Sequence, residues 1–564
     1  MEFRGEEEKQ LDRLTLAAHL GAIDRRSFLK TLLAAGVSAV FAAELSDHAA
    51  MAAENQRTRR TNLLASYDYI VVGAGAAGCV LANRLSANPA VNVLLLEPGS
   101  ADVDQPKLYD PALWSLNLGS ETDWAFTSAP QPGLNGRELP LGAGRVIGGS
   151  ASINGLAWVR GDAREYLAWE RMAGPEWGAF RMISNFHHIE SYAGAPDPRR
   201  GRNGPIGTTS LVGGHPLTRP LIEAGREFGL PEVAFNAAPL VDGVGPSDLN
   251  IRDGRRSGPA QGYLLPVLSR PNLTLLTGVE VMSLIIEGGV CRGVRAVAGD
   301  TPMTFRADGE VVLSAGALRS PKLLLQSGVG PADELRALGI TVHADSPRVG
   351  RGLQDGVSVT GVEFQTRQLL PPSVGNGLGC FFYARTNPVS EGPNLQIIST
   401  QFGTGAESGA SFLLIPCLIK PHSRGEIRLT SADPRAPARI DPRCFSAPED
   451  LETLSRGLQL TTEIGLSRRL SSITNGVAFP GRLSRAERIA YIRNASFTSD
   501  HPTSSCAMGL DHHSALDPKL RVRGVRGLRV VDASAMPQLP ASNIQAPTLM
   551  LAENAARLMG FGRT

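Results

Sequence analysis

Short runs made up mainly of apolar residues recur along the chain. Residues 69–72 and 91–96 form two such runs near the N-terminus, and residues 311–313 and 530–531 form two more. Runs of this length without regular polar alternation are typical of strands buried on both faces of a parallel sheet. Residues 79–85, which follow the first run, instead place apolar side chains at helical intervals. The pattern predicts an α/β fold that begins with a strand–turn–helix unit.

A glycine-rich turn joins the first predicted strand to this helix. Gly73, Gly75 and Gly78 have the spacing G-x-G-x-x-G. In such a turn the first glycine allows a tight bend, the second lets a phosphate approach, and the third packs helix on strand. The second predicted strand ends at Glu97, 19 residues after Gly78. A carboxylate at this place can accept hydrogen bonds from the hydroxyls of a ribose. These residues predict a dinucleotide at the helix N-terminus, and a phosphate-free strand–helix–strand unit is the alternative.

A different pattern fills the middle of the chain. Residues 271–279 read as a strand followed by a meander of residues 281–286 and 290–298, while residues 396–397 and 412–415 read as strands of an antiparallel sheet. A chain of 564 residues is too long for one compact core, so two large domains are expected. The expected fold class is therefore α/β, and α+β when the antiparallel part is included.

Composition narrows the classes of function. With 42% hydrophobic and 20% charged residues the chain is ordinary for a globular protein, and a net charge of +2 without a dense basic stripe argues against nucleic acid as a partner. The six cysteines are scattered and form no C-x-x-C pair, which excludes the usual zinc and c-type haem motifs and makes a disulfide framework unexpected. No metal site is predicted.

The first 53 residues have the pattern of an export signal. The paired arginines Arg25 and Arg26 come shortly before a weakly apolar run, residues 31–43, which is too short to span a bilayer. Small residues up to Ala53 are suited to cleavage, so we expect a signal of the twin-arginine type, removal near Ala53 and a location in the bacterial periplasm. The alternative is an N-terminal segment, disordered or an amphipathic helix, with a chance arginine pair.

A glycine- and serine-rich loop spans Gly144 to Asn154 and reads G-R-V-I-G-G-S-A-S-I-N. It has too little bulk for a core element, and its backbone amides can lie flat against a planar ligand. In these residues the chain resembles the glucose–methanol–choline family of FAD-dependent oxidoreductases, whose first signature is G-R-x-I-G-G-S-x-x-I-N. Members that attach FAD covalently have a histidine just before the asparagine. This chain has Ile153 there, so the resemblance implies non-covalent FAD.

The second signature of that family is matched by residues 316–330, and the resemblance covers nearly all of the chain from Tyr67 onward. It implies a Rossmann-like FAD-binding domain and a discontinuous substrate-binding domain with an antiparallel sheet. The FAD-binding domain is assigned to residues 66–164, 258–356 and 495–564, and the substrate-binding domain to residues 165–257 and 357–494.

The resemblance also implies which residues contact the cofactor: the glycine turn, the strand ends and the signature loop. They are Gly73, Gly75, Ala76, Ala77, Gly78, Glu97, Pro98, Trp124, Arg145, Val146, Gly149, Ser150, Asn154, Gly155, Leu156, Ala157, Val279, Asp532, Ala533 and Asn543. A helix that starts after Pro547 would direct its positive end at the pyrimidine part of the flavin.

Two residues near the C-terminus are suited to alcohol oxidation. A base must hold the hydroxyl proton, and imidazole titrates near neutrality, while a second group should orient the same oxygen. His501, within H-P-x-x-S-C-x-M-G, and Asn543 match the histidine and the histidine-or-asparagine of the family's catalytic pair. Asp500 stands where the family often has an aromatic residue or asparagine. The sequence leaves open whether its carboxylate raises the pKa of His501 or points away.

The predicted function is FAD-dependent oxidation of a primary alcohol to the aldehyde, with O2 or a quinone- or cytochrome-type acceptor. The C-terminal motif is similar to those of hydroxymethylfurfural oxidase and choline dehydrogenase-like enzymes. The alternatives are a lyase of the same fold, like the hydroxynitrile lyases, a redox-silent FAD-binding protein and, more remotely, a light-driven decarboxylase. No membrane span is expected, and the sequence leaves open which alcohol is used, whether the enzyme is an oxidase or a dehydrogenase, and the oligomeric state.

Overall fold

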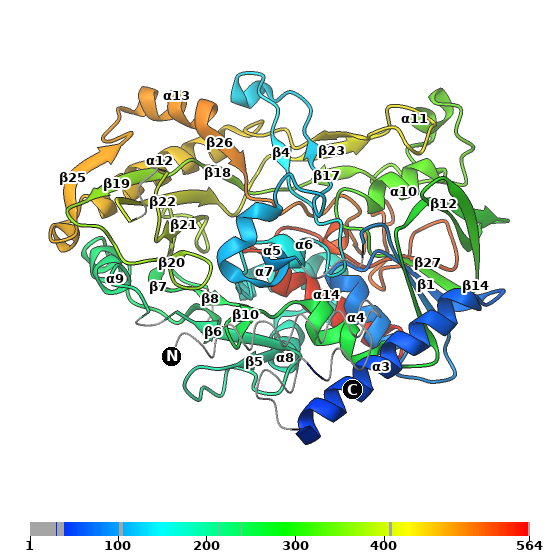
Figure 1. Ribbon diagram of the computed structural model, residues 1–564. Coiled ribbons are helices and arrows are strands. Elements are labelled where there is room, and N and C mark those ends of the chain that lie inside the picture. Colours follow the sequence, from blue (N-terminus) through cyan, green and yellow to red (C-terminus); the bar gives the residue numbers. More distant parts are fainter. Residues whose placement is uncertain are drawn as a thin grey trace.

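The computed structural model describes residues 30, 39–100, 105–211, 214–237, 240–404 and 409–561. Two large sheets lie side by side in it, a seven-stranded sheet on the right of Figure 1 and an eight-stranded sheet on the left. The expected mixed α/β architecture is confirmed.

The seven-stranded sheet is built around the first predicted strand. Its order is β11-β2-β1-β14-β13-β12, with β27 paired to β14, and the contacts among β11, β2, β1, β14 and β27 are parallel. The strands are β1 (Tyr67–Val72), β2 (Val93–Glu97), β11 (Leu273–Thr277), β12 (Val279–Glu287), β13 (Val290–Ala298), β14 (Thr301–Leu313) and β27 (Leu528–Val530). The apolar runs therefore form buried parallel strands, as predicted.

Strand β14 takes part in both antiparallel and parallel pairing. Its first half pairs antiparallel with β13, which makes the predicted meander, and its second half pairs parallel with β1. Because β1, β2, β14 and β27 end at the same edge, the residues that follow them converge on one region of the molecule.

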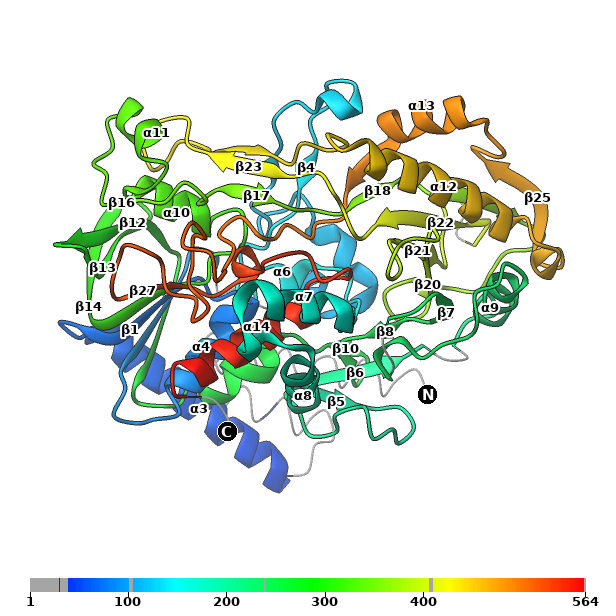
Figure 2. The same ribbon diagram turned by 180° about the vertical axis from the view of Figure 1, so that it is seen from behind.

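Two helices pack side by side against this sheet, α4 (Ala76–Leu85) and α14 (Gln545–Leu558), and α8 (Ala179–Ile189) packs on α14 (Figure 2). The helix expected to start after Pro547 in fact starts at Gln545. Proline is tolerated there because the first turn of a helix leaves its N–H groups without intrahelical acceptors. Residues 165–189, which the sequence analysis gave to the substrate-binding domain, contribute side chains to the hydrophobic core of this first sheet.

Helix α3 (Ala39–Thr61) covers the edge strand β11, at the lower right of Figure 1. Gln56 donates to the carbonyls of Leu268 and Leu273 and accepts from the N–H of Leu275 (2.8, 3.0 and 2.9 Å). The side chain therefore occupies hydrogen-bonding positions that an edge strand would otherwise offer to another chain.

The eight-stranded sheet has the order β25-β19-β22-β21-β20-β7, with β18 paired to both β22 and β26, and its pairs are antiparallel. Its strands are β7 (Gly243–Pro246), β18 (Val357–Val359), β19 (Val362–Thr366), β20 (Leu378–Ala384), β21 (Leu395–Thr400), β22 (Ser411–Leu418), β25 (Thr474–Phe479) and β26 (Ser496–Thr498). Helices α9 (Thr218–Glu227) and α12 (Pro448–Gly465) pack on it around Phe364, Phe382 and Phe412, which are fully buried.

Shorter elements connect the two sheets. The helices are α5 (Pro106–Tyr109), α6 (Ser150–Ile153), α7 (Ala163–Ala173), α10 (Ser320–Gln326), α11 (Ala332–Ala337) and α13 (Arg485–Ala495). The strands are β3 (Phe126–Thr127), β4 (Pro140–Leu141), β5 (Glu190–Tyr192), β6 (Ile206–Ser210), β8 (Asp248–Leu249), β9 (Ile251–Arg252), β10 (Arg255–Arg256), β15 (Val329–Gly330), β16 (Ala344–Asp345), β17 (Arg351–Leu353), β23 (Gly425–Arg428) and β24 (Arg439–Asp441).

Three predictions of the sequence analysis stay predictions at this level. The domain boundaries have no independent test. The signal residues Arg25 and Arg26 lie outside the described residues. Ala53 lies within α3, and the side chains of α3 that bind the β11 edge, Asn55, Gln56 and Arg60, all follow it. Among the described residues, no helix has the length and apolar character that a membrane span requires.

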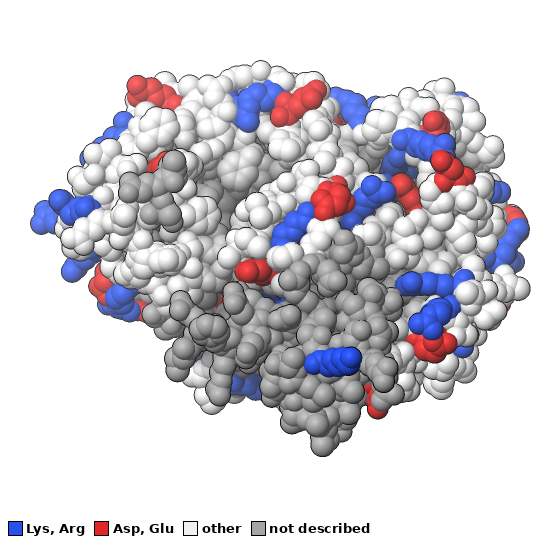
Figure 3. Space-filling model, viewed as in Figure 1, with Lys and Arg blue, Asp and Glu red and all other residues white. Residues whose placement is uncertain are grey.

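Charged side chains of both signs are interspersed on the face shown in Figure 3. The expectation that nucleic acid is not a partner stays a prediction.

Candidate functional site

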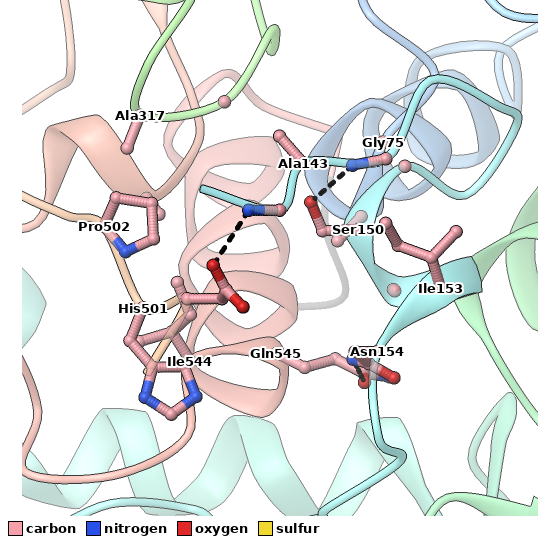
Figure 4. A pocket seen from close by; sticks show the side chains of 18 of the residues that line it. Gly75, Ala143, Ser150, Ile153, Asn154, Ala317, His501, Pro502, Ile544 and Gln545 are labelled. Carbon is pink, nitrogen blue, oxygen red and sulfur yellow. Dashed lines mark hydrogen bonds between the residues drawn. The ribbon is translucent and has the colours of Figure 1, made fainter. Parts of the chain in front are cut away.

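A cavity of about 650 Å³ is bounded by the carboxyl ends of the parallel strands on one side and by the eight-stranded sheet on the other. Volumes of roughly 300–1,000 Å³ are typical of small-molecule sites. Figure 4 shows His501 and Asn154 entering this cavity from opposite sides. The site thus joins residues from the two ends of the chain.

The glycine turn forms one end of the cavity. Gly73 has φ +102°, and a Cβ at Gly78 would lie 1.9 Å from the carbonyl oxygen of Gly73, so both positions require glycine for the protein's own packing. Gly75 differs, because a Cβ there would meet protein atoms only at 3.8 Å and beyond while the residue lines the cavity. Gly75 therefore keeps space free for a ligand rather than for the fold.

Glu97 lies at the end of β2 and is buried. Its two oxygens accept from the N–H groups of Ala74 and Gly99, each at 2.8 Å. Burial raises its pKa to about 7, against the lowering effect of these hydrogen bonds. Glu97 lines the cavity, and each of its oxygens can accept a further hydrogen bond, as the predicted ribose contact requires.

The signature loop forms the wall opposite His501. Gly149 has φ +57°, and a Cβ there would come within 2.8 Å of Cα of Gly75, so the loop and the glycine turn touch backbone to backbone. Ile153, in α6, lines the cavity with an aliphatic side chain (Figure 4).

Trp124 closes another side of the cavity. It stacks on Phe126 at 5.7 Å between ring centroids, and the guanidinium of Arg319 lies 3.9 Å from its ring centroid. Arg319 is also paired with Glu280 at 2.6 Å.

Asn154, at the end of the loop, is held from both sides. Its Oδ1 accepts from Nη1 of Arg256 at 2.6 Å, and its Nδ2 donates to Oε1 of Gln545 at 2.6 Å. Gln545 is the first residue of α14 and lines the cavity (Figure 4). These contacts tie the loop, β10 and α14 together.

His501 and Asn543 are brought together as the sequence analysis predicted, with Nε2 of His501 3.3 Å from Nδ2 of Asn543. The amide of Asn543 has its orientation fixed because its Oδ1 accepts from Nε2 of Gln396, which in turn donates to the hydroxyl of Tyr383 (3.3 and 2.6 Å). Nδ2 of Asn543 is therefore the donor and Nε2 of His501 the acceptor, which places the proton of the neutral imidazole on Nδ1. The lone pair of Nε2 therefore points toward Asn543, and it can take a proton from a hydroxyl that enters between the two side chains.

The electrostatics keep this imidazole neutral. Burial lowers the pKa of His501 to about 4, and no carboxylate among the described residues offsets this. The backbone N–H of His501 donates to Oδ1 of Asp355 at 2.8 Å, which fixes the position of the chain rather than the charge of the ring. A neutral imidazole is the form that a general base needs.

The carboxylate of Asp500 does not raise the pKa of His501, which burial lowers. Oδ1 of Asp500 accepts from the N–H of Gly142 at 2.9 Å, and the residue lines the cavity. Burial inside the molecule and the negative charge of Asp355 raise its pKa to about 7. Asp500 therefore gives the cavity wall beside His501 a titratable acceptor.

Most of the predicted cofactor residues line the cavity. The exceptions are Gly78, which packs on Gly73, Arg145, whose guanidinium lies 4.8 Å from the ring centroid of Trp124, and Val146 and Val279, which are buried. Their assigned contacts rest on the resemblance alone.

The sequence analysis missed several wall residues. They are Trp114, Leu118, Glu280, Arg319, Phe402, Leu413, Ile415, Phe497 and Gln545. For Arg319 a signal existed, since it follows β14 at the edge where parallel strands end. The apolar residues of the eight-stranded sheet carried no such signal, because they resemble ordinary core residues.

Comparison with known proteins gives a consistent result. Family models described as GMC oxidoreductase match residues 67–358 and residues 421–552. An alcohol dehydrogenase [acceptor] of Pseudomonas putida is 35% identical over 87% of this chain and 95% of its own length, and an oxygen-dependent choline dehydrogenase of Ectopseudomonas mendocina is 34% identical over 87% and 93%. The crystal structure of pyridoxine 4-oxidase from Mesorbium loti superposes with a TM-score of 0.83, at 33% identity over 88% of this chain and all of that one.

Proposed function

This chain belongs to the GMC oxidoreductase family, and from that premise we propose that it oxidises a primary alcohol to the aldehyde, with His501 as base and Asn543 as the group that orients the hydroxyl. Like its relatives it is an FAD-dependent oxidoreductase that acts on CH–OH donors. The observation that supports the proposed roles is the hydrogen-bonded pair of His501 and Asn543 in the wall of the cavity.

The residues present fit FAD. Gly75 leaves space that a Cβ would fill, Glu97 offers acceptors at the end of β2, and Nε2 of Gln545 is a buried donor without a partner among the described residues. Gly75 with the start of α4 would hold the pyrophosphate, Glu97 the ribose, and the loop at Asn154 with Gln545 the ring system. When bound, FAD supplies the two-electron acceptor for the carbon that is oxidised.

His501 and Asn543 bind the substrate hydroxyl and remove its proton. A substrate hydroxyl that enters between them accepts a hydrogen bond from Nδ2 of Asn543 and donates its proton to Nε2 of His501. Gln396 holds the amide of Asn543 in the donating orientation throughout, and Asp355 holds the backbone of His501. The pair therefore fixes the alcohol oxygen at one point and removes its proton there.

The substrate side of the cavity is mostly apolar. Its walls include Trp114, Phe402, Leu413, Ile415 and Phe497. Such walls exclude water from the site and favour a substrate with an apolar body. We propose a small-molecule alcohol as substrate and O2 or a quinone- or cytochrome-type partner as electron acceptor.

The proposed base predicts a simple pH dependence. Because burial holds the pKa of His501 near 4, below its ordinary value of 6.5, the imidazole is neutral at pH 7. We expect kcat/KM to carry no limb near pH 6.5 and to fall as the pH drops toward about 4, since protonation abolishes the base.

An inflection near pH 7 that comes from Asp500, whose pKa is raised to about 7, should disappear in Asp500→Asn. Burial also raises the pKa values of Glu97 and Asp355 to about 7, so an inflection that persists is assigned with Glu97→Gln and Asp355→Asn. A limb near pH 6.5 that persists in all three variants would contradict the assigned state of His501. The measurement is a steady-state pH profile of wild type and variants.

We propose that FAD is held without a covalent bond, because Ile153 supplies no nucleophilic atom where covalent members of the family carry a histidine. Acid precipitation of the purified protein should release the flavin into the supernatant. Absorbance of supernatant and redissolved pellet at flavin wavelengths measures this. Yellow colour that remains with the pellet would show a covalent link.

We also propose export by the folded-protein route, on the support of the sequence pattern at Arg25 and Arg26. Removal near Ala53 would leave Gln56 and Arg60, which bind the β11 edge, and would take away Ala52, which is buried in the core. Exchange of both arginines for lysine should leave unprocessed precursor in the cytoplasm, as fractionation and immunoblotting would show. Arg57→Lys in α3 is the control, and normal export of the double variant would refute the route.

One experiment tests the proposed function against a same-fold lyase or a redox-silent protein. A panel of alcohols is mixed anaerobically with the FAD-loaded protein while the flavin absorbance is followed. Bleaching by primary alcohols is expected, because the site holds a base and an orienting amide beside the cofactor. Absence of bleaching by every alcohol, with the flavin still reducible by dithionite, would favour the alternatives.

A further inference from the structure

Arg256 is a buried cation without an acidic partner among the described residues. Its side chain donates to the carbonyls of Leu108, Ala151 and Asn154 (2.9, 3.1 and 2.7 Å) and to Oδ1 of Asn154 at 2.6 Å. Burial lowers its pKa only to about 9, so the guanidinium stays charged at neutral pH. A buried charge that only neutral acceptors solvate is costly, so a fold that keeps one calls for an explanation.

One hydrogen bond from Arg256 begins a series that ends at a residue of the cavity wall. Because the guanidinium can only donate, the atom of Asn154 that it contacts must be Oδ1, and Nδ2 must then face Gln545. Nδ2 donates to Oε1 of Gln545 at 2.6 Å, so Nε2 of Gln545 is the end of the series. The orientation of both amides is fixed by the charge at the far end.

The last donor of this series has no acceptor. Gln545 is 93% buried as a residue, since its exposure is 7%, and its Nε2 has no hydrogen-bond partner among the described residues. Gln545 lines the cavity and is also the first residue of α14, a helix of 14 residues whose N-terminus carries a partial positive charge. An unsatisfied buried donor at such a place points to a ligand with an electron-rich acceptor.

We propose that Arg256, Asn154 and Gln545 form a polarised relay that stabilises the negative charge which the flavin ring gains on reduction, and so raises the reduction potential of the bound FAD. The buried charge of Arg256 polarises the two amides in series toward Gln545, which lines the cavity at the start of α14. Charge and hydrogen bonds near the ring are the means by which a protein tunes a flavin. Arg256 and Asn154 act as positioning residues through Gln545.

A structural role alone would have different consequences. If Arg256 only tied the loop at Ala151 and Asn154 to β10, its loss would loosen the loop and weaken FAD binding without a consistent change in potential. Measurements that report the charge of the flavin ring, and that need no alcohol substrate, therefore distinguish a role in charge stabilisation from a purely structural role. Such measurements are also independent of whether His501 is the base.

The test uses the FAD-loaded protein and sulfite, which adds reversibly to oxidised flavins and leaves a negative charge on the ring. We expect Arg256→Gln to weaken sulfite binding by about 10-fold and to lower the reduction potential by about 30 mV, since tenfold corresponds to 29.6 mV for a two-electron couple. Arg256→Lys, which keeps the charge, should retain most of the sulfite affinity and of the reduction potential of the wild type. Gln545→Met, which removes the terminal donor while keeping the shape, should shift both in the same direction as Arg256→Gln.

Arg252→Gln is the matched control, because it removes one positive charge from the neighbouring strand β9 at an exposed position. It should leave both quantities unchanged. An Arg256→Gln protein with wild-type potential and sulfite affinity would overturn the relay, and so would an Arg256→Lys protein that behaves like Arg256→Gln. If Arg256→Gln loses FAD on purification, the test rests on the reduction potential of the Gln545→Met protein. A wild-type potential in that protein would refute the proposal.

Discussion

Replacing His501 by alanine is expected to slow reduction of the flavin by an alcohol by at least about 100-fold, the lower end of what general acid–base groups contribute. The imidazole is the neutral acceptor beside Asn543, and no other described side chain in the cavity combines that position with a free basic nitrogen. FAD content should not change, because the contacts proposed for the nucleotide lie at Gly75, Glu97 and the signature loop. Rapid mixing under anaerobic conditions measures the rate directly.

Two further variants make this result specific. Asn543→Ala should cost less, about 1.5–3 kcal/mol for one hydrogen bond to a charged or reacting group, because it removes an orienting donor and leaves the base in place. His512→Ala is the matched control, since that side chain is 83% exposed on the surface. Deuterium at the α-carbon of the alcohol should slow reduction in wild type. A wild-type rate in His501→Ala would remove His501 from the catalytic role.

Replacing Gly75 by valine is expected to give a folded protein without flavin. The backbone of Gly75 has φ −73° and ψ −165°, which other residues adopt, and a Cβ there would approach protein atoms no closer than 3.8 Å. The added side chain would instead fill the space beside the start of α4, where the pyrophosphate is expected. The ratio of flavin to protein absorbance measures the loss, and circular dichroism measures the fold.

Gly78→Ala separates this effect from damage to the fold. A Cβ at Gly78 would lie 1.9 Å from the carbonyl oxygen of Gly73, so α4 would have to move away from β1. We expect lower thermal stability in this variant, whether or not FAD is bound. A Gly75→Val protein with full FAD content, or one that is unfolded, would show that Gly75 does not serve the ligand.

Much of this protein follows from local sequence. The apolar runs at residues 69–72 and 91–96 form β1 and β2, and the glycine spacing between them gives the turn with the roles assigned to Gly73 and Gly78. Such features depend on residues within one turn or strand of each other, so periodicity and backbone sterics suffice to predict them. The pairing of His501 with Asn543 was also predicted, but from a family resemblance, because nothing local links residues 42 positions apart.

The tertiary structure alone decided how these pieces become a site. Arg256 donates a hydrogen bond to Asn154, 102 positions away in the sequence, and Asn154 donates one to Gln545, a further 391 positions away. The orientation of the Asn543 amide is set by a hydrogen bond from Gln396, 147 positions away. No periodicity encodes such contacts, since each depends on which strands lie side by side. The pKa of His501 likewise depends on burial by distant segments rather than on its neighbours. Local sequence determines backbone conformation, whereas the direction of side-chain hydrogen bonds and the desolvation of titratable groups depend on tertiary packing.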